Sequence, residues 1–567
     1  MEQRKNVNDQ AQGGKAKSFV AGAAILAVAG LIVKILGAVY RIPLNNLIGT
    51  EGMSYYAVAY PYYSWLLVIS SAGLPAAISK LVSERVTRGD HKAAYRVFQI
   101  AFRILLVIGI ITTILMAALA RPLARMSDLD GASLSFLALA PSLLFVSVMC
   151  AYRGYLQGLQ QMTGTALSQI TEQFIKLIAG LYLARKLLPK GPEYAAQGAL
   201  LGVTISEVLG LVVIAFFYYR QRKNGLAVMI RQAPVMAKES TRSVIRYLAA
   251  MAIPITLGAS IMPLTGIADS ALILNSLKNS SKAIEWAQSS GVVVQAKDAA
   301  DLVGRWAQSA YAIFRSYVTT IINMPAVLTS ALAMSLVPAM SAYLASNKKK
   351  SAKRAAVTGM KLSMIIGAPC AVGLFVLARP ILMLLFKSSL DNPGKIAMAE
   401  SIMQISAIGV LFLSVVQALT GVLQGIGRPR IPVINLVLGG LVKIFSMILL
   451  MKIMNIYGAA LSTVFCYAVA AVLDTLWLIR YMHLKIDIFD VFGKPMLASL
   501  TMGIYAAAVF QKLDGRGNIA TLLAIAVAVG IYGAMVVLLR MFSPSDLEFV
   551  PGGRKLAKLL YRGERED

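Results

Sequence analysis

The chain has 567 residues, 58% of them hydrophobic, and a formal net charge of +29. Apolar runs long enough to cross a bilayer recur from end to end, which excludes an ordinary soluble protein and indicates an all-α, polytopic membrane protein. The charge would suggest nucleic acid in a soluble protein. Here we expect no nucleic-acid partner, because Lys and Arg of membrane proteins gather in the loops that stay inside.

The predicted spans follow one another from a polar and basic N-terminus. The first residues lead into a full-length apolar run rather than a short signal-peptide core, so we expect them to stay in the cytosol. A window of about 19 residues predicts about 14 spans, and the excess of Lys and Arg on one side places both termini in the cytosol. The predicted parts are a cytosolic tail (1–18), an N-lobe of six spans (19–222), a cytosolic linker (223–245), a C-lobe of six spans (246–485), two additional spans (486–543) and a basic cytosolic tail (544–567).

The first span carries two cations where charge is costly. In LIVKILGAVYRIPL, Lys34 and Arg41 are seven residues apart, and two helical turns return to nearly the same face, about 10 Å along the axis. Gly37 lies between them and leaves room beside them. Two such cations suit an anion with several oxygens, such as a diphosphate, which Arg can bind bidentately. The alternative is that they reach out to lipid headgroups, and Arg41 is nearer the end of the span.

Spans one to six and seven to twelve repeat one another. LLFVSVMCAYRGYLQG (143–158) matches VLFLSVVQALTGVLQG (410–425), and at the same offset Lys176 falls on Lys443. A protein with two parallel repeats is expected to bind its substrate between them near the midplane, and matched proline-interrupted helices indicate where. We therefore predict two six-helix lobes related by a pseudo-two-fold axis. The predicted hinges or helix breaks are Pro61, Pro75, Pro325 and Pro338.

Further charges lie inside the predicted spans. Glu172 and Lys176 are four residues apart on one helix and are expected to neutralise one another, whereas Lys443 has no acid four residues before it. Asp269 is predicted to pair with a cavity cation or to bind a coupling H⁺ or Na⁺, and Glu172 is a second candidate. Arg315 either lines the cavity or reaches the headgroups. Whether three more charged side chains face the cavity stays open: Arg103, Glu207 and Asp474.

The sequence lacks the motifs of an ATPase or a metalloprotease. It has no Gly-rich phosphate loop followed by Lys-Ser or Lys-Thr and no His-Glu-x-x-His. The three cysteines each fall within an apolar run and indicate core positions rather than a metal site. A duplicated bundle without such motifs favours a transporter over an enzyme. We expect no cofactor or metal beyond a coupling ion, and a monomer.

Three stretches resemble a known superfamily: KILGAVYRIPLNNLIGTEGMSYYAVAY, SSAGLPAAISKLVSE and INMPAVLTSALAMSLVPAMSAY. With the RGYLQG and TGVLQG span ends, they make the chain similar to the multidrug/oligosaccharidyl-lipid/polysaccharide exporter superfamily. Within it, the chain resembles the SpoVB-type polysaccharide biosynthesis proteins and the MurJ-like lipid II flippases. The resemblance implies two lobes around a cationic cavity in the bacterial plasma membrane, opened alternately to each side. It also implies that the last two spans flank a groove for a lipid tail.

The predicted function is a flippase that moves an undecaprenyl-diphosphate-linked cell-wall precursor, lipid II or a related glycan, to the outer leaflet. Its partners would be that lipid-linked glycan and the membrane lipids, with Lys34 and Arg41 holding the diphosphate and Arg315 or Lys443 helping. One alternative is a cation-coupled drug exporter, which would use a lone buried acid such as Asp269. The other is a glycan polymerase or ligase. A role in growth and a role in sporulation both remain open.

Overall fold

The computed structural model describes residues 2–233, 240–513 and 517–542. In these ranges every regular element is a helix, and ten stretches are long and apolar enough to cross a membrane. The prediction of an all-α polytopic protein is thus confirmed. The chain forms two compact units, Met1–Ala271 and Leu272–Asp567. The predicted basic tail, 544–567, lies outside the described residues.

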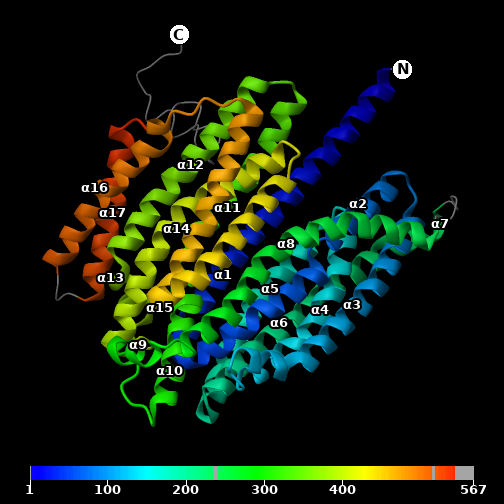
Figure 1. Cartoon of the computed structure of the whole chain (residues 1–567). Coiled ribbons are helices and arrows are strands. Elements are labelled where there is room, and N and C mark those ends of the chain that lie inside the picture. Colours follow the sequence, from blue (N-terminus) through cyan, green and yellow to red (C-terminus); the bar gives the residue numbers. More distant parts are fainter. Residues whose placement is uncertain (1, 234–239, 514–516, 543–567) are drawn as a thin grey trace. The chain divides into compact units, whose positions relative to one another are not determined.

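Unit 1 contains the helices up to most of α8, and its helices α3, α4, α5 and α6 run side by side (Figure 1). Its elements are α1 (Glu2–Ser71), α2 (Leu74–Thr87), α3 (His91–Met126), α4 (Ala132–Gly158), α5 (Met162–Leu187), η1 (Leu188–Lys190), α6 (Pro192–Gln221), η2 (Arg222–Leu226), α7 (Ala227–Gln232) and α8 (Thr241–Lys278).

Unit 2 begins within α8 and continues to the last described residue. Its elements are α9 (Ala283–Ser290), α10 (Ala299–Ala312), η3 (Ile313–Val318), α11 (Thr319–Ala345), α12 (Lys349–Val376), α13 (Ala378–Phe386), α14 (Pro393–Gly425), α15 (Arg430–Met482), η4 (Phe489–Gly493), α16 (Lys494–Lys512) and α17 (Asn518–Leu538).

Two of the longest helices bend and so provide two spans each. In α1 the bend is at Gly49, whose φ of 68° and ψ of −177° suit glycine, because a Cβ atom strains this conformation. In α15 the bend is at Met454 and Asn455, and Asn455 is left-handed with φ of 45°. The hydropathy of the sequence predicts span centres near Val33 and Leu67 and near Leu441 and Ala468, so each bend falls between two predicted spans.

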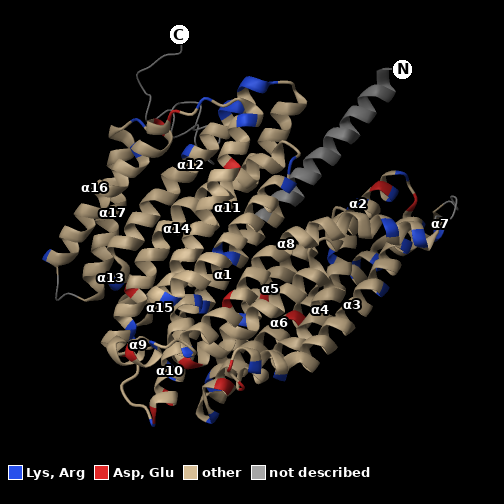
Figure 2. Cartoon of the chain, viewed as in Figure 1, with Lys and Arg blue, Asp and Glu red and all other residues tan. Residues whose placement is uncertain are grey.

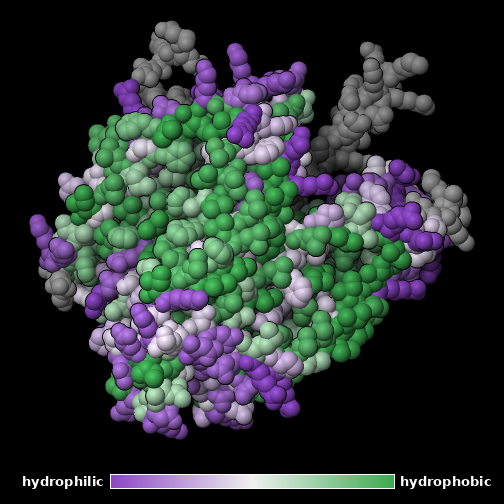
Figure 3. Space-filling view, in the orientation of Figure 1, coloured by the Kyte–Doolittle hydropathy of each residue, from purple (hydrophilic) through white to green (hydrophobic). Residues whose placement is uncertain are grey.

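Side chains follow the pattern expected of helices in a membrane. Large apolar residues stay exposed in mid-helix, for example Ile114 of α3 at 62% and Val529 of α17 at 68%. Hydrophobic residues cover the helices in broad areas, and hydrophilic residues gather near the helix ends (Figure 3). Most Lys and Arg lie at those ends, whereas few charges interrupt the helices themselves (Figure 2). Those few charges are therefore the first places to look for a site.

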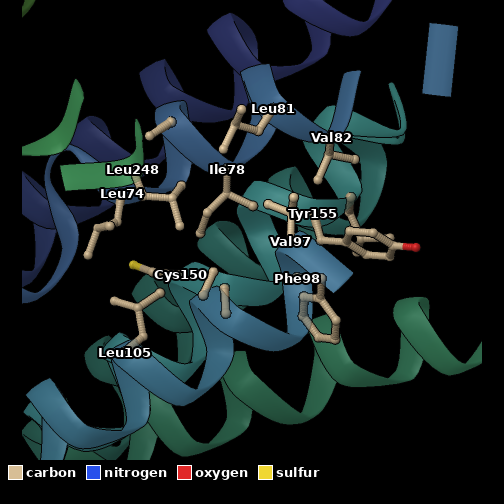
Figure 4. Close-up of a cluster of buried hydrophobic side chains, with 14 of the residues drawn as sticks. Leu74, Ile78, Leu81, Val82, Val97, Phe98, Leu105, Cys150, Tyr155 and Leu248 are labelled. Atoms are coloured by element: carbon tan, nitrogen blue, oxygen red, sulfur yellow. The ribbon is translucent and has the colours of Figure 1, made fainter. Parts of the chain in front are cut away.

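A buried apolar cluster holds α2, α3 and α4 together in unit 1 (Figure 4). Ile78 of α2, Phe98 of α3 and Tyr155 of α4 are all buried, and the Phe98 and Tyr155 rings lie 4.8 Å apart. Cys150 of α4 belongs to the same cluster. This cluster keeps α4 in place, and α4 carries one of the charged residues of the site below.

Glycines at repeat-equivalent positions make the same kind of helix contact in each unit. A Cβ atom at Gly154 of α4 would come within 2.9 Å of Ile78 on α2, and one at Gly421 of α14 within 2.4 Å of the Ala333 carbonyl on α11. These close approaches require glycine, because any side chain would separate the helices. The repeat seen in the sequence thus has a packing role in both units.

Helices α5 and α6 approach each other through glycines. A Cβ atom at Gly202 of α6 would lie 2.3 Å from the Cα atom of Gly180 on α5, and one at Gly198 would lie 2.5 Å from the Leu183 carbonyl oxygen. Small residues at a helix interface let two backbones pack closely in lipid. This contact sets the distance between the charged side chains of the two helices.

Gly202→Val is expected to lower the stability of the protein by about 1–3 kcal/mol or more, because the added side chain forces α5 and α6 apart. The matched control is Gly530→Val on α17, where a Cβ atom would meet nothing within 4 Å. Thermal unfolding of the detergent-purified proteins measures both. Equal midpoints for the two variants would contradict the packing described for Gly202.

Asp490 of η4 is expected to stabilise unit 2 in a pH-dependent way. Its carboxylate accepts hydrogen bonds from Lys361 at 2.7 Å and from Lys494 at 2.8 Å. Partial burial by itself raises the pKa of Asp490, but these two ammonium groups lower it below its ordinary 3.8. A lowered pKa contributes stability that is complete above the ordinary value and is lost as the pH falls through the folded-state value. The stability difference between wild type and Asp490→Asn should therefore shrink below about pH 4, as measured by chemical unfolding.

Candidate functional site

Two cations and three tyrosine rings meet inside unit 1, and we call them the tyrosine–cation cluster: Tyr40, Arg41, Tyr56, Tyr60 and Lys176. The Arg41 guanidinium lies over the rings of Tyr56, at 4.7 Å, and Tyr60, at 5.2 Å. The Lys176 ammonium lies over the rings of Tyr40, at 5.4 Å, and Tyr60, at 5.6 Å. The ring of Tyr60 is therefore shared by both cations.

The cluster is assembled from α1 and α5, with α6 supporting it. Tyr56 and Tyr60 are one turn apart on α1, and their rings stack 5.5 Å apart at an angle of 14°. Tyr40 is buried, packs against Gly180 of α5 and donates a hydrogen bond of 3.4 Å to the Ala199 carbonyl of α6. Each ring face stabilises a nearby cation by about 2 kcal/mol where water is excluded.

A second group of charges, beside the cluster, is internally paired. Arg153 of α4 forms an ion pair with the buried Glu172 of α5 and donates hydrogen bonds to Ser168 Oγ at 2.8 and 3.1 Å. Glu172 packs against α6 at Gly210, where a Cβ atom would lie 2.6 Å from Glu172 Cγ. The pair neutralises both charges, so it leaves no net charge for a ligand.

A cavity of about 390 Å³ in unit 1 joins the two groups. Tyr60 and Lys176 of the cluster line it, as do Arg153 and Glu172 of the pair. Glu207 of α6 also lines it, and the buried Oε2 atom of Glu207 accepts no hydrogen bond from the described residues. Three amide side chains also line it: Gln157, Gln169 and Gln173.

The sequence-predicted residues of the first span end up in different surroundings. Arg41 is partly buried and belongs to the tyrosine–cation cluster, whereas Lys34 is exposed and does not line the cavity. Gly37 leaves room, because a Cβ atom there would meet only Gln173 of α5, at 3.7 Å. Glu172 is near the cluster, but its ion pair is with Arg153 of α4 and not with Lys176.

The other predicted residues lie elsewhere in the fold. Asp269 is fully buried on α8 and does not line the cavity. In unit 2, Arg315 is partly buried in η3 and Lys443 is buried in α15. The prolines differ in setting: Pro75 is in the first turn of α2, after a break in the helix, whereas three lie inside helices, namely Pro61, Pro325 and Pro338.

Sequence reasoning did not select Tyr56, Tyr60 or Arg153, and it left the facing of Glu207 open. A signal for the tyrosines was available, since Tyr56 and Tyr60 follow the helical spacing of four in YAVAYPYY. Arg153 stands in the repeated RGYLQG motif, where the other copy has Thr420. The Arg153–Glu172 ion pair therefore has no counterpart at the equivalent position of the second copy.

The arrangement favours an anionic ligand. Among the described residues, neither Arg41 nor Lys176 forms an ion pair. Both cations lie over tyrosine ring faces, which stabilise the positive charge, and their N–H groups can bind oxygen atoms of a ligand. Cationic groups at membrane depth are costly and therefore indicate a ligand of opposite charge. In the described ranges, no three His, Cys, Asp or Glu side chains gather in a way that could hold a metal ion.

Comparisons with known proteins identify the family and several relatives. The family described as "Polysaccharide biosynthesis protein" matches residues 19–344, and the family described as "Lipid II flippase MurJ" matches residues 306–528. From Bacillus subtilis (strain 168), the "Stage V sporulation protein B" is 26% identical, covering 94% of this chain and 98% of the relative. The "Lipid II flippase MurJ" of the same organism is also 26% identical, covering 90% and 93%.

Solved structures show the same fold at low sequence identity. The lipid II flippase MurJ in an inward closed conformation matches with a TM-score of 0.66 and 15% identity, over 91% of this chain and 98% of that one. An inward-facing MATE family multidrug resistance transporter matches with a TM-score of 0.61 and 14% identity, over 80% and 94%. These likenesses concern the fold alone.

Proposed function

Since this chain belongs to the polysaccharide biosynthesis protein family, we propose that it is a flippase for an undecaprenyl-diphosphate-linked cell-wall precursor. It carries lipid II or a related lipid-linked glycan from the inner to the outer leaflet by alternating access, as a monomer and coupled to H⁺ or Na⁺. The relative named as a lipid II flippase supports this class of substrate.

The tyrosine–cation cluster is the observation that carries the proposal. Arg41 and Lys176 are two positive charges held on tyrosine rings inside a spanning unit, and a diphosphate is the anionic part of the proposed substrate. Arg41 binds two phosphate oxygens at once through its planar guanidinium, and Lys176 adds a point charge. Lys34 is exposed, and we assign it the first contact with the diphosphate.

The cavity beside the cluster suits a sugar. Its three glutamine amides both donate and accept hydrogen bonds, which matches the hydroxyl and amide groups of a glycan. The ring of Tyr63 lines the same cavity and adds an apolar surface beside the amides. A diphosphate at Lys176 thus leaves the first sugar facing the amides.

Depletion of the protein in cells, followed by labelling of lipid-linked precursors exposed on the outer leaflet, tests the function. We expect the exposed precursor to fall and the inner pool to rise, in growing cells or in sporulating cells according to when the protein acts. An unchanged exposed pool in both would overturn the proposal. A changed susceptibility to a panel of drugs, with normal precursor exposure, would instead support the drug exporter.

A purified sample distinguishes a flippase from an enzyme. Reconstituted protein should move a fluorescent undecaprenyl-diphosphate sugar across a vesicle bilayer and leave its glycan chemically unchanged. A product with a longer or a transferred glycan would identify a polymerase or ligase.

A further inference from the structure

Glu207 is an acid at membrane depth that the diphosphate site does not use. It lies on α6, lines the cavity and is mostly buried, and its Oε2 atom has no donor within the described ranges. A carboxylate oxygen without a hydrogen-bond donor in an apolar setting is costly. A proton on that oxygen removes the charge, so the geometry is that of a proton-binding carboxyl.

The groups facing Glu207 come from three other helices. They are Tyr60 and Tyr63 of α1, Cys150 and Arg153 of α4, and Glu172 and Lys176 of α5. Two of these groups are cations, and one of them, Arg153, forms an ion pair with Glu172. Lys176 is therefore the cation whose charge opposes that of Glu207, and it is also the cation assigned to the diphosphate.

We place the proton route to Glu207 at the end of unit 1 near the α2–α3 turn. A second cavity there, of about 690 Å³, is lined by Lys80 and Arg88 of α2, and Gln157 of α4 lines both cavities. The route would therefore pass the Gln157 side chain, and Lys80 at the second cavity is exposed. The adjoining stretch SERVTRGDHKAAYR (83–96) is rich in Lys and Arg, which predicts a cytosolic loop.

The internal repeat places a similar pair in the other unit. At the offset that relates Lys176 to Lys443, Glu207 falls on Asp474. Asp474 is fully buried, accepts a hydrogen bond of 2.7 Å from Asn435 on Oδ1, and has no donor to its buried Oδ2 from the described residues. A lysine and an acid with an unsatisfied oxygen thus recur at the same positions, whereas the Arg153–Glu172 pair does not.

We propose that Glu207 takes up a proton when a diphosphate binds at Lys176 and releases it when the anion leaves. The proposal rests on the proposed function, and it assigns the coupling ion as H⁺ and the coupling group as Glu207. An anion at Lys176 cancels the positive charge that favours ionised Glu207 and adds a negative charge nearby, so both changes favour the neutral acid. By reciprocity, the bound proton strengthens anion binding by the same factor.

Proton uptake on ligand binding tests this link directly. Calorimetric binding of undecaprenyl diphosphate to the purified full chain, in two buffers of different ionisation enthalpy, gives the protons taken up per ligand. We expect uptake to approach one proton per ligand for wild type at alkaline pH, where ligand-free Glu207 is ionised, and the affinity to fall by up to about tenfold per pH unit in that range. Glu207→Gln should bind with no uptake and little pH dependence. The matched control is Glu193→Gln, the same change on the first turn of α6 outside the cavity, which should behave as wild type.

An uptake in Glu207→Gln equal to that of wild type, or no uptake in a wild type that binds the ligand, would overturn the proposal. Infrared titration without ligand is the second measurement, because it needs only folded protein. Wild type should show a protonated-carboxyl band that changes with pH and is missing in Glu207→Gln. The absence of this band in wild type would also overturn the proposal. A wild type that shows this band but binds and flips no lipid diphosphate refutes the proposed function and leaves Glu207 as a proton site.

Discussion

Lys176→Gln is expected to reduce flipping of a lipid-linked diphosphate about tenfold or more. A charge-assisted hydrogen bond is worth about 1.5–3 kcal/mol, and about 1.4 kcal/mol is a factor of ten. Glutamine keeps the polarity and much of the length of lysine, but it carries no charge to a phosphate and loses the contacts with the rings of Tyr40 and Tyr60. The flipping rate in vesicles, with protein amount and folding checked, measures the effect.

Lys34→Gln is the matched control for this prediction. Lys34 is exposed on α1, so neutralising it should change flipping much less than neutralising Lys176. The sequence alone ranks these residues the other way, because Lys34 lies deep in the first span, whereas Lys176 has Glu172 four residues before it. A severe loss in Lys34→Gln together with normal transport by Lys176→Gln would show that the tyrosine–cation cluster is not the site.

Arg153→Leu is expected to destabilise the protein by about 3–5 kcal/mol, because it leaves the Glu172 carboxylate buried without its partner. The Ser168 hydroxyl also loses the donor that approaches it at 2.8 Å. Unfolding of the purified variant by heat or denaturant in detergent measures the loss.

The double variant Arg153→Leu with Glu172→Leu separates the ion pair from the packing around it. Replacing both members of a buried pair with apolar side chains is often neutral, so the double variant should recover most of the lost stability. A double variant as unstable as the sum of the two single variants would show that the two residues act independently, against the ion pair seen between α4 and α5.

The spans could be predicted from the sequence because their stability is local. In lipid every backbone polar group must be satisfied within the helix itself, so an apolar run of sufficient length is enough to specify a span. The predicted centres at Val33 and Leu67 lie on either side of the Gly49 bend, and those at Leu441 and Ala468 on either side of the α15 bend. The glycines of the repeat were equally visible, because close helix contacts in membranes require small residues.

The composition of the site was harder to predict, because it depends on contacts between helices. Helical spacing predicted that Glu172 pairs with Lys176, four residues on. The cation that pairs with it is Arg153, from the preceding helix, since α4 packs there through the buried cluster shown in Figure 4. Released from that pairing, Lys176 is available to a ligand.

The sequence by itself determined that the chain is a duplicated, all-helical membrane protein with cations inside its predicted spans, where charge is costly. Hydropathy, internal repeats and charges within a span follow directly from the order of residues along the chain, so they can be found in the sequence. Only the tertiary structure decided that Arg41 and Lys176 share the ring of Tyr60, that Arg153 neutralises Glu172, and that Glu207 faces a cavity with an unsatisfied oxygen. Each of these contacts depends on which faces of α1, α4, α5 and α6 pack against one another. Residues far apart in sequence decide this, as the contact between Gly180 of α5 and Gly202 of α6 shows.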